Sequence, residues 1–260
     1  MDKLTDIWNQ ILEESELKVS SEPESKNIFS KKILPFANFE DALSSKLASD
    51  LKSDSYSETF LSAKFNQVFS VKENLEAALK DINAVKERDP ASQGYVLTLL
   101  FSKGFAALQA HRAAYFFLSR NEEVFSFFLQ SKSSEIYGVD IHPAAKIGEG
   151  VMLDHATGIV IGETSVVENE VSIFQGVTLG GTGKETGDRH PKVRQGVLIS
   201  SGAKILGNVE IGKGAKVAAG SVVLENVEPK TTVAGVPAKV VGIPSSDKPA
   251  TEVDHTIEEN

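Results

Sequence analysis

Among the histidines of this 260-residue sequence that stand directly beside a charged side chain, His155 and His190 are the first candidates for chemistry. His155 follows Asp154 in the run MLDHATG, and His190 follows Arg189 in GDRHP. An imidazole titrates near neutral pH and can accept a proton from an alcohol, while a nearby carboxylate stabilises the imidazolium that forms. An arginine beside a histidine offers cationic and hydrogen-bonding groups to a carboxylate ligand. These residue types indicate a general base at one position and anion binding at the other, although a solvated loop charge explains Arg189 at least as well.

Two further carboxylates are candidates to act with these residues. Asp140 precedes His155 by about one coil of the scaffold described next, so it could hold the imidazole and fix its tautomer. A turn- or helix-capping role explains Asp140 equally well. Asp89 stands before Pro90, where it can simply end a helix, because the residue before a proline disfavours the helical conformation.

The scaffold for these residues is predicted by a six-residue rhythm that begins at Ile141. Large aliphatic residues recur every six positions, with a two-residue slip after Leu153 and an interruption at 180–192. They are Ile141, Ile147, Leu153, Ile161, Val167, Ile173, Leu179, Val193, Ile199, Ile205, Ile211, Val217 and Val223. Tandem hexads are typical of a parallel β-helix, in which each hexad forms one short strand and one turn. His155 lies at the slip, and His190 lies in the interruption, a glycine- and charge-rich excursion of the kind in which rigid scaffolds carry their sites.

The residues before Tyr137 follow a helical period instead. Apolar side chains recur at helical spacing at Phe39, Leu43, Leu47 and Leu51. The most apolar stretch, 91–130, is predicted to form core helices, with an oligomer contact as the alternative use of that surface. We expect an α+β protein with a helical domain over 1–138, a β-helix domain over 139–243 with a loop excursion at 180–192, and a flexible tail over 244–260.

The composition excludes several classes of function. The formal charge is −9 and the pI is about 5.2, so we expect no nucleic-acid partner, because such a surface needs a basic patch. The absence of cysteine removes disulfides, thiolate zinc sites and a cysteine nucleophile, and it fits a reducing cytoplasm. No stretch approaches the ~20 apolar residues that a membrane span needs. We therefore expect a cytoplasmic protein without a membrane contact.

The motifs LDHATG, GGTGK and GDRHPK, placed after a helical segment that carries RDPAS, closely resemble the serine O-acetyltransferases of bacteria and plants. The hexads alone are shared by many acyltransferases, but this combination is highly specific, and the likeness runs from about residue 5 to 244. The resemblance implies a left-handed parallel β-helix, trimers formed through the β-helices, and in many members pairs of trimers joined by their helical domains. It also implies active sites between adjacent β-helices and transfer of acetyl from acetyl-CoA to L-serine, as the committed step of cysteine biosynthesis.

The resemblance also implies roles for single residues. His155 resembles the general base, with Asp140 orienting it, and His190 resembles a group that supports the tetrahedral intermediate. Asp89 and Asp154 resemble the carboxylates that hold the amino group of serine, while Arg189 and His190 resemble the groups that hold its carboxylate. For the acetyl-CoA arm the resemblance implies Gly181, Thr182, Gly183, Ala203, Lys216 and Ala218. It implies direct transfer in a ternary complex, without a metal.

Partners and competing functions follow from the same likeness. L-cysteine is the expected feedback inhibitor, because it differs from L-serine only in thiol for hydroxyl. Many members end in an isoleucine that inserts into O-acetylserine sulfhydrylase, but this sequence ends with Ile257 followed by Glu-Glu-Asn, which puts that partnership in doubt. The alternatives are a hexapeptide acetyltransferase for homoserine or a sugar, a zinc enzyme like the γ-type carbonic anhydrases, and a non-catalytic scaffold. The zinc enzyme is disfavoured, because such a site uses a close pair of histidine ligands, and His142, His155 and His190 do not include one.

Overall fold

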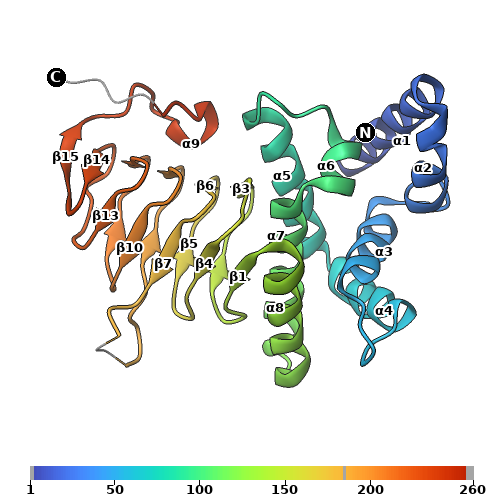
Figure 1. Cartoon of the computed structure of the whole chain (residues 1–260), viewed down its shortest axis with the longest axis horizontal. Helices are drawn as coiled ribbons and strands as arrows, with labels where there is room; N and C mark the ends of the chain where they lie inside the picture. The colour runs from blue at the N-terminus through green and yellow to red at the C-terminus, as the bar shows by residue number, and fades with distance from the viewer. Residues whose placement is uncertain (1–2, 184–185, 256–260) are drawn as a thin grey trace.

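The computed structural model describes residues 3–183 and 186–255, and it consists of a helical half and a β-helix half placed end to end (Figure 1). The helical half contains α1 (Lys3–Ser21), η1 (Pro23–Ser25), α2 (Lys26–Lys32), α3 (Phe39–Leu51), α4 (Glu58–Phe69), α5 (Lys72–Arg88), α6 (Tyr95–Phe101), α7 (Lys103–Leu118) and α8 (Glu123–Tyr137). Several helices begin where a side chain accepts a backbone N–H of the first turn, as Asn38, Ser57 and Ser102 do. Helix α8 ends at Gly138, whose left-handed conformation (φ 69°) turns the chain into the first strand.

The apolar stretch 91–130 is mostly core. Helices α6 and α7 bury most of their side chains, and Phe105 and Phe117 are among the largest fully buried groups of the described chain. His111 belongs to this core. Its burial lowers its pKa to about 3, and the charge of Arg112 contributes to the same shift. The histidine is therefore neutral and structural. Phe101 and Val124 remain exposed, so some apolar surface is left on the helical half.

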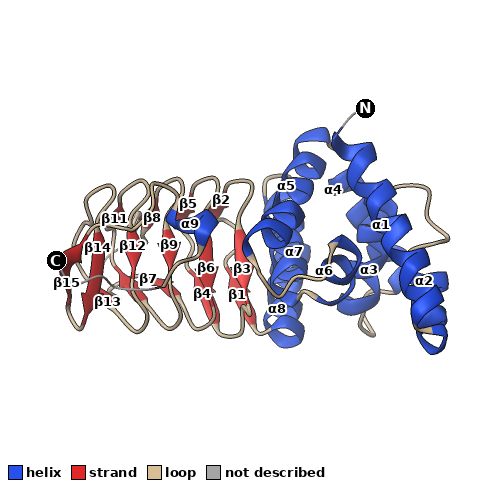
Figure 2. Cartoon of the chain, turned by 90° about the horizontal axis from the view of Figure 1, so that it is seen from above, coloured by secondary structure: helices blue, strands red, loops and turns tan. Residues whose placement is uncertain are grey.

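The β-helix is built from short strands that form three flat sheets (Figures 1 and 2). Sheet A contains β1 (Val139–Ile141), β4 (Ile159–Ile161), β7 (Thr178–Gly180), β10 (Lys204–Leu206) and β13 (Val222–Val223). Sheet B contains β2 (Lys146–Ile147), β5 (Val166–Val167), β8 (Lys192–Val193) and β11 (Glu210–Ile211). Sheet C contains β3 (Met152–Asp154), β6 (Ser172–Phe174), β9 (Leu198–Ile199), β12 (Lys216–Val217), β14 (Thr232–Gly235) and β15 (Ala238–Gly242). All the pairings are parallel except that of β14 with β15, so the predicted class, helices followed by a parallel β-helix, is confirmed.

On each sheet, a ladder of aliphatic residues covers the face that points into the interior of the β-helix. In sheet A, Ile141 pairs with Ile161, then come Leu179, Ile205 and Val223, all of them buried. The steps between them show that the slip and the excursion both leave the ladder in register, because the extra residues leave the wall at a turn. The coils therefore stack as the hexads predict, with apolar burial as the main stabilising term.

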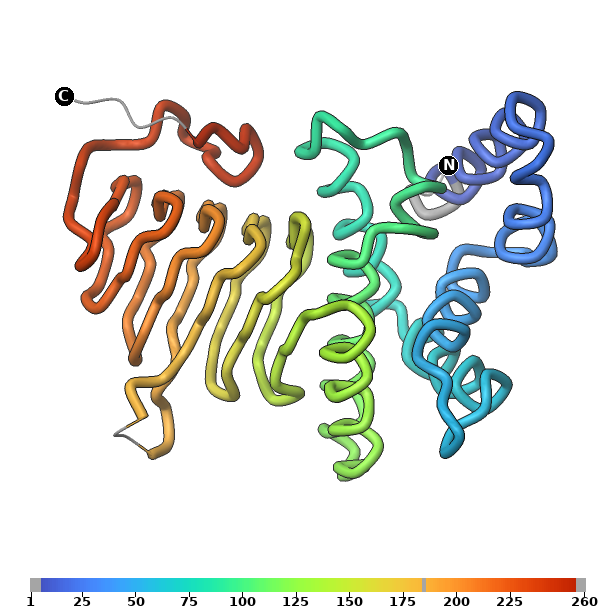
Figure 3. Tube along the Cα trace, in the orientation of Figure 1, coloured from blue at the N-terminus to red at the C-terminus, as the bar shows by residue number. Residues whose placement is uncertain are grey.

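The chain passes from sheet to sheet at three corners, which are named here by the sheets they join. The A–B corner includes residues 142–145, 162–165, 181–183 and 186–191. The B–C corner includes 148–151, 168–171 and 194–197, and the C–A corner includes 155–158, 175–177, 200–203 and 218–221. Each coil contributes one turn to each corner. The turns at one corner therefore form a row along the axis of the β-helix (Figure 3).

A buried ion pair joins the two halves. Arg112 on α7 contacts Asp81 on α5 at 2.7 Å and donates to the carbonyl oxygens of Ile147 and Gly148 in the first coil. The other oxygen of Asp81 accepts the N–H of Val151 at 3.0 Å. Removing one partner of such a pair typically costs about 3–5 kcal/mol, because the other charge stays buried. This network fixes α5 and α7 against the coil that carries the first site residues.

The segment after the β-helix folds back over sheet C. Residues 244–260 are expected to form a flexible tail, but Pro249–Glu252 form the short helix α9, and the carbonyl of Ala250 accepts the Ser172 hydroxyl at 2.7 Å. The ring of His255 packs edge-on against Phe174 and contacts the Ser200 hydroxyl at 3.0 Å. The end that bears on O-acetylserine sulfhydrylase, Ile257–Asn260, lies outside the described residues. No helix among the described residues is long and apolar enough to cross a membrane.

Candidate active site

The C–A corner of the first coil carries the first group of site residues. Strand β3 ends at Asp154, and His155 follows in a left-handed conformation (φ 52°) that turns its side chain outward. The backbone N–H of His155 donates to the Asp154 carboxylate at 3.0 Å, and Nε2 of its ring lies 3.7 Å from the other carboxylate oxygen. The His155 side chain is 74% exposed. A ring so open is accessible to a substrate hydroxyl.

Asp89 joins this group from the helical half. It follows the last residue of α5 and lines a cavity of about 320 Å³ together with Asp154, Ser92 and Ser102. Burial raises the pKa of the Asp154 carboxyl; His155 lowers it, and the negative charge of Asp89 raises it again. Two carboxylates that repel each other across a small cavity are suited to an ammonium group, whose charge relieves the repulsion.

A glycine lets α7 approach this corner closely. A Cβ on Gly104 would stand 2.0 Å from the carbonyl oxygen of Leu153, the residue before Asp154. Only glycine fits there without moving the helix or the strand. Gly104 of the run KGF therefore lets α7 pack directly against the strand that ends one residue before the candidate base, His155.

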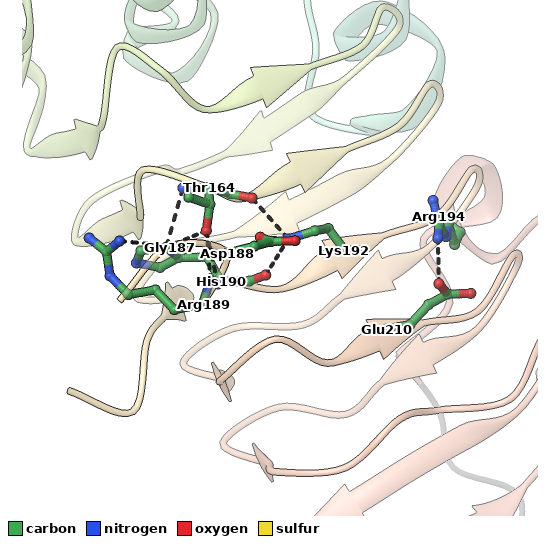
Figure 4. Close-up of polar contacts among 8 residues, drawn as sticks. All are labelled: Thr164, Gly187, Asp188, Arg189, His190, Lys192, Arg194 and Glu210. Atoms are coloured by element: carbon green, nitrogen blue, oxygen red, sulfur yellow. Dashed lines mark hydrogen bonds and ion pairs between the residues drawn. The ribbon is translucent and has the colours of Figure 1, made fainter. Parts of the chain in front are cut away.

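The A–B corner carries the second group, which lies in the excursion and the turn beneath it (Figure 4). Nη2 of Arg189 contacts the Glu163 carboxylate at 2.7 Å, and the Thr164 hydroxyl accepts the backbone N–H groups of Arg189 and His190 at 3.0 and 3.1 Å. Lys192 donates to Asp188 at 2.6 Å and to the His190 carbonyl at 2.7 Å. These contacts hold the excursion against the β-helix wall.

The His190 ring is fixed in one tautomer. Its Nδ1 accepts the N–H of Thr164 at 3.2 Å, so the proton of the neutral ring is on Nε2, which has no hydrogen-bond partner among the described residues. Burial, followed by the positive charge of Arg189, lowers the pKa of His190, so the ring is neutral at pH 7. The ring lies over Gly162, where a Cβ would stand 2.1 Å from Nε2. The site therefore presents an N–H donor beside a guanidinium, a pair suited to a carboxylate or an oxyanion.

The two groups stand on opposite edges of sheet A, and the chain does not bring Asp140 to His155. Asp140 lies on β1, where Gln130 of α8 donates to it at 2.7 Å. Its charge acts on His142 of the A–B corner, whose pKa is lowered by burial and raised by Glu163 and Asp140. No hydrogen bond or ion pair links Asp140 with His155 within the described chain.

All the residues predicted for acetyl-CoA except Lys216 lie along the same two corners. Gly181, Thr182 and Gly183 begin the excursion at the A–B corner, with the Thr182 methyl group against Gly207. Ala203 and Ala218 are buried at the C–A corner, so they offer backbone rather than side chain to a ligand. Lys216 is buried on sheet C, close enough to His255 that its charge lowers the pKa of that histidine after burial has done so. Among residues 3–183 and 186–255 no three His, Asp or Glu side chains are grouped as metal ligands.

Sequence reasoning missed Gly162, Glu163 and Thr164, although all three shape the second group. They stand in the hexad IGETSV, where the glycine and the polar residues match an ordinary turn. Only the packing of the excursion onto this turn shows that Gly162 makes room for a ring and that Glu163 pairs with a guanidinium. A lone glycine after an aliphatic residue is common to many of the hexads and gave no signal.

The fold and the paired site groups define a hexapeptide-repeat acyltransferase. Comparison with known proteins specifies the family: residues 7–110 match the family model "Serine acetyltransferase, N-terminal", and residues 190–225 match the bacterial transferase hexapeptide repeat. The chain is 49% identical over 254 residues to the serine acetyltransferase of Escherichia coli, covering 97% of this chain and 93% of that protein. The chain belongs to the serine acetyltransferase family and is an acyltransferase.

Two solved structures agree over nearly the whole chain. A serine acetyltransferase in complex with cysteine is 47% identical, with a TM-score of 0.94 over 97% of this chain and 98% of that one. The serine acetyltransferase of Brucella abortus strain S19 in complex with coenzyme A is 46% identical, with a TM-score of 0.90 over 92% of this chain and 96% of that one. The helical half and the β-helix are thus matched together.

Proposed function

We propose that this chain transfers the acetyl group of acetyl-CoA to the hydroxyl of L-serine in the cytoplasm, giving O-acetyl-L-serine and CoA for cysteine biosynthesis. The observation that carries the proposal is the division of charge between the two corners. The carboxylates Asp89 and Asp154 stand beside an exposed imidazole, while a guanidinium and an N–H donor stand at the other edge of sheet A. A zwitterion needs both groups, because each satisfies only one of its charges.

The two groups meet when the β-helix of a second chain packs on sheet A. The C–A corner of one chain then faces the A–B corner of its neighbour, so His155 of one chain stands with Arg189, His190 and Asp140 of the next. Asp140 already shares its surroundings with the A–B group, which supports a dyad formed between chains. This arrangement closes as a trimer, and the exposed apolar residues of the helical half suit the pairing of two trimers.

The reaction then needs no covalent intermediate on the protein. His155 accepts the proton of the serine hydroxyl as the oxygen attacks the thioester carbonyl carbon. The tetrahedral intermediate breaks its C–S bond, and the imidazolium returns the proton to the CoA thiolate. Nε2–H of His190 donates to the developing oxyanion or to the serine carboxylate beside Arg189. Positioning of both substrates supplies much of the rate, and the general base contributes about 10²–10⁴-fold.

L-cysteine fits the same charges as L-serine and lacks only the hydroxyl. We therefore propose that it inhibits by competing with serine, which the cysteine complex of the related enzyme supports. The CoA complex of the Brucella enzyme likewise supports CoA as the carrier of the acetyl group. We propose that its arm lies along the two corners, from Gly181–Gly183 toward Ala218.

The reaction is tested by release of thiol from acetyl-CoA, followed with a thiol-reactive dye. The chain contains no cysteine and gives no background signal. Release that depends on L-serine supports the proposal, and L-homoserine and a sugar acceptor serve as comparisons. Release with another acceptor but not with L-serine would redirect it to a different acetyltransferase, and no release with any acceptor would refute it.

The assembly of the site between chains is tested by hybrid oligomers. A chain with His155→Ala and a chain with Arg189→Ala are each expected to be nearly inactive. When the two are coexpressed, an interface that joins the intact His155 of one chain to the intact Arg189 of another is complete, so about a quarter of the wild-type activity should return. If both residues act from the same chain, the mixture stays as inactive as its components.

A further inference from the structure

A second cavity lies at the B–C corner, and none of its lining residues belongs to either group of site residues. It has a volume of about 500 Å³ and is enclosed by α1, α5 and turns of the first three coils. Figure 2 shows α5 beside the end of the β-helix that adjoins the helical half, where this corner begins. The proposed contact between chains uses the two corners that flank sheet A, so the B–C corner is left free in such an assembly.

Arg88, the last residue of α5, supplies the unused positive charge of this cavity. Its side chain is buried (7% exposed), and Nη1 donates to Val171 O and the Ser172 hydroxyl at 3.4 and 3.2 Å. Among the described residues neither Nε nor Nη2 has a hydrogen-bond partner. Nη2 stands 4.0 Å from where a Cβ on Gly150 would lie, and Gly150 also lines the cavity. A buried guanidinium with a free edge is suited to donate hydrogen bonds to a carboxylate there.

Four glutamates line the same cavity. Glu76 lies 3.7 Å from Lys72 and Glu149 is paired with Lys80, which leaves Glu87 and Glu170. Glu87 forms no ion pair in the described chain, and Glu170 accepts only a 3.3 Å contact from Gln195.

Glu170 stands close to the guanidinium, because its Cγ and Nη2 of Arg88 lie 3.6 and 4.0 Å from the same point beside Gly150, and Glu87 directly precedes Arg88 in the chain. Burial lowers the pKa of Arg88, and the charges of Glu170, Glu87 and Asp81 raise it. The other cation of the wall, Lys80, is already paired with Glu149. The groups left free are therefore one guanidinium edge and two carboxylates.

The remaining wall is apolar. Ile7 from α1 and Leu79 and Ala84 from α5 line the cavity beside these charges. A simple anion would meet the two carboxylates, and a simple cation would meet Arg88. A ligand with a carboxylate and an ammonium group on adjacent atoms satisfies both, and an apolar side chain fills the rest.

We propose that the B–C corner cavity binds a free α-amino acid with an apolar side chain. Arg88 receives its carboxylate, Glu87 and Glu170 receive its ammonium group, and the wall of Ile7, Leu79 and Ala84 receives its side chain. This site is distinct from the site of serine, because Asp89 and Asp154 line another cavity at the C–A corner.

The test is calorimetric titration of the full chain with L-leucine, L-methionine and L-phenylalanine, in saturating L-serine and CoA. These two fill the active site without reacting. At least one amino acid should bind once per chain in the micromolar-to-millimolar range, whereas leucinamide and 4-methylpentanoate, which lack one charge each, should not bind. The double variant Glu87→Gln/Glu170→Gln alters only exposed groups and should weaken binding at least about tenfold, a loss of 1.4 kcal/mol.

Arg88→Met should abolish this binding, and Glu73→Gln, an exposed carboxylate on the same helix outside the cavity, serves as the matched control. Titration heats that survive the double variant unchanged would overturn the proposal. So would the absence of binding by all three amino acids at millimolar concentration, or displacement of the bound amino acid by L-serine. Because binding is measured without turnover, this result does not depend on the catalytic assay.

Discussion

The two corners that flank sheet A differ in how completely their polar groups are already satisfied. At the A–B corner, Arg189 is paired with Glu163, and the excursion is held by Thr164 and Lys192. At the C–A corner, His155 has one long contact with Asp154 and is open to solvent. The first corner is organised before a ligand arrives, and the second is left to be completed by one. We infer that the side of the site that receives the substrate carboxylate is organised in advance, and that the side with the general base is completed by the substrate.

The largest expected effect comes from removing the open imidazole. His155→Ala should lower kcat by about 10²–10⁴-fold, because the proton of the serine hydroxyl loses its acceptor. Affinity for CoA should not change, because His155 is not among the residues proposed to hold CoA. Steady-state thiol release and CoA titration measure the two quantities. Near-normal turnover would contradict the assignment of the base.

A substitution at Gly162 can disturb the A–B corner without replacing any polar side chain. Gly162→Ala places a methyl group where the His190 ring lies, so the ring must move. We expect kcat/KM for L-serine to fall by about ten- to a hundredfold, because small displacements of a positioned group are costly. The control is Gly212→Ala, which also crowds backbone, at Pro229, but far from the site. It should lower stability and leave kcat/KM per folded chain unchanged; equal losses in both variants would make the effect one of folding.

The pH profile examines the carboxylates of the open corner. The charge of Asp89 contributes to the raised pKa of Asp154, so Asp89→Asn should lower that pKa. In the proposed site, serine binding needs ionised Asp154, so it should weaken as the pH falls through the pKa of this carboxyl. The acidic limb of kcat/KM for serine should therefore move to lower pH in the variant, while the maximum falls because one carboxylate is lost. A limb that stays in place would assign it to another group.

The smallest effect is expected from the ion pair that occupies Arg189. Glu163 competes with the substrate carboxylate, so Glu163→Gln should lower the KM for serine by about two- to fivefold, since a part-exposed pair is worth up to about 1 kcal/mol. The matched control is Glu168→Gln. Glu168 lies in the same coil as Glu163, and its carboxylate is paired with Arg194. A rise in KM for Glu163→Gln alone would mean that Glu163 orients Arg189 rather than competing with the substrate.

The sequence predicts the scaffold better than the contacts made across it. The hexads determine which residues point inward, because burial of an aliphatic ladder repeats in every coil, and the pairing of Ile141 with Ile161 follows that pattern. The pairing of Asp140 with His155 was argued from the same stacking. Within the chain, however, Asp140 stacks on Val160 and bonds Gln130 instead. A repeat specifies neighbours within one chain but carries no information on what a second chain brings.

The excursion and the C-terminal segment show a second limit. Arg189 reaches Glu163 across 26 residues, and the Ser172 hydroxyl reaches the carbonyl of Ala250 across 78. Neither contact leaves a period in the sequence, because each depends on where an irregular segment lands. A polar run without a repeat was therefore expected to be flexible, although part of it packs on sheet C.

The stacked coils also act as a ruler. His155 and Ala218 occupy the same corner of the first and fourth coils, and neighbouring strands lie about 4.8 Å apart, so roughly 14 Å separates the two levels. In the proposed placement of the acyl donor along this corner, the spacing of the coils sets how far the reacting end of the extended thioester lies from the end that carries its nucleotide. Removing one whole coil would keep every inward ladder in register and shorten this length by one step. The number of hexads would then select the length of the acyl donor's arm as well as stabilise the fold.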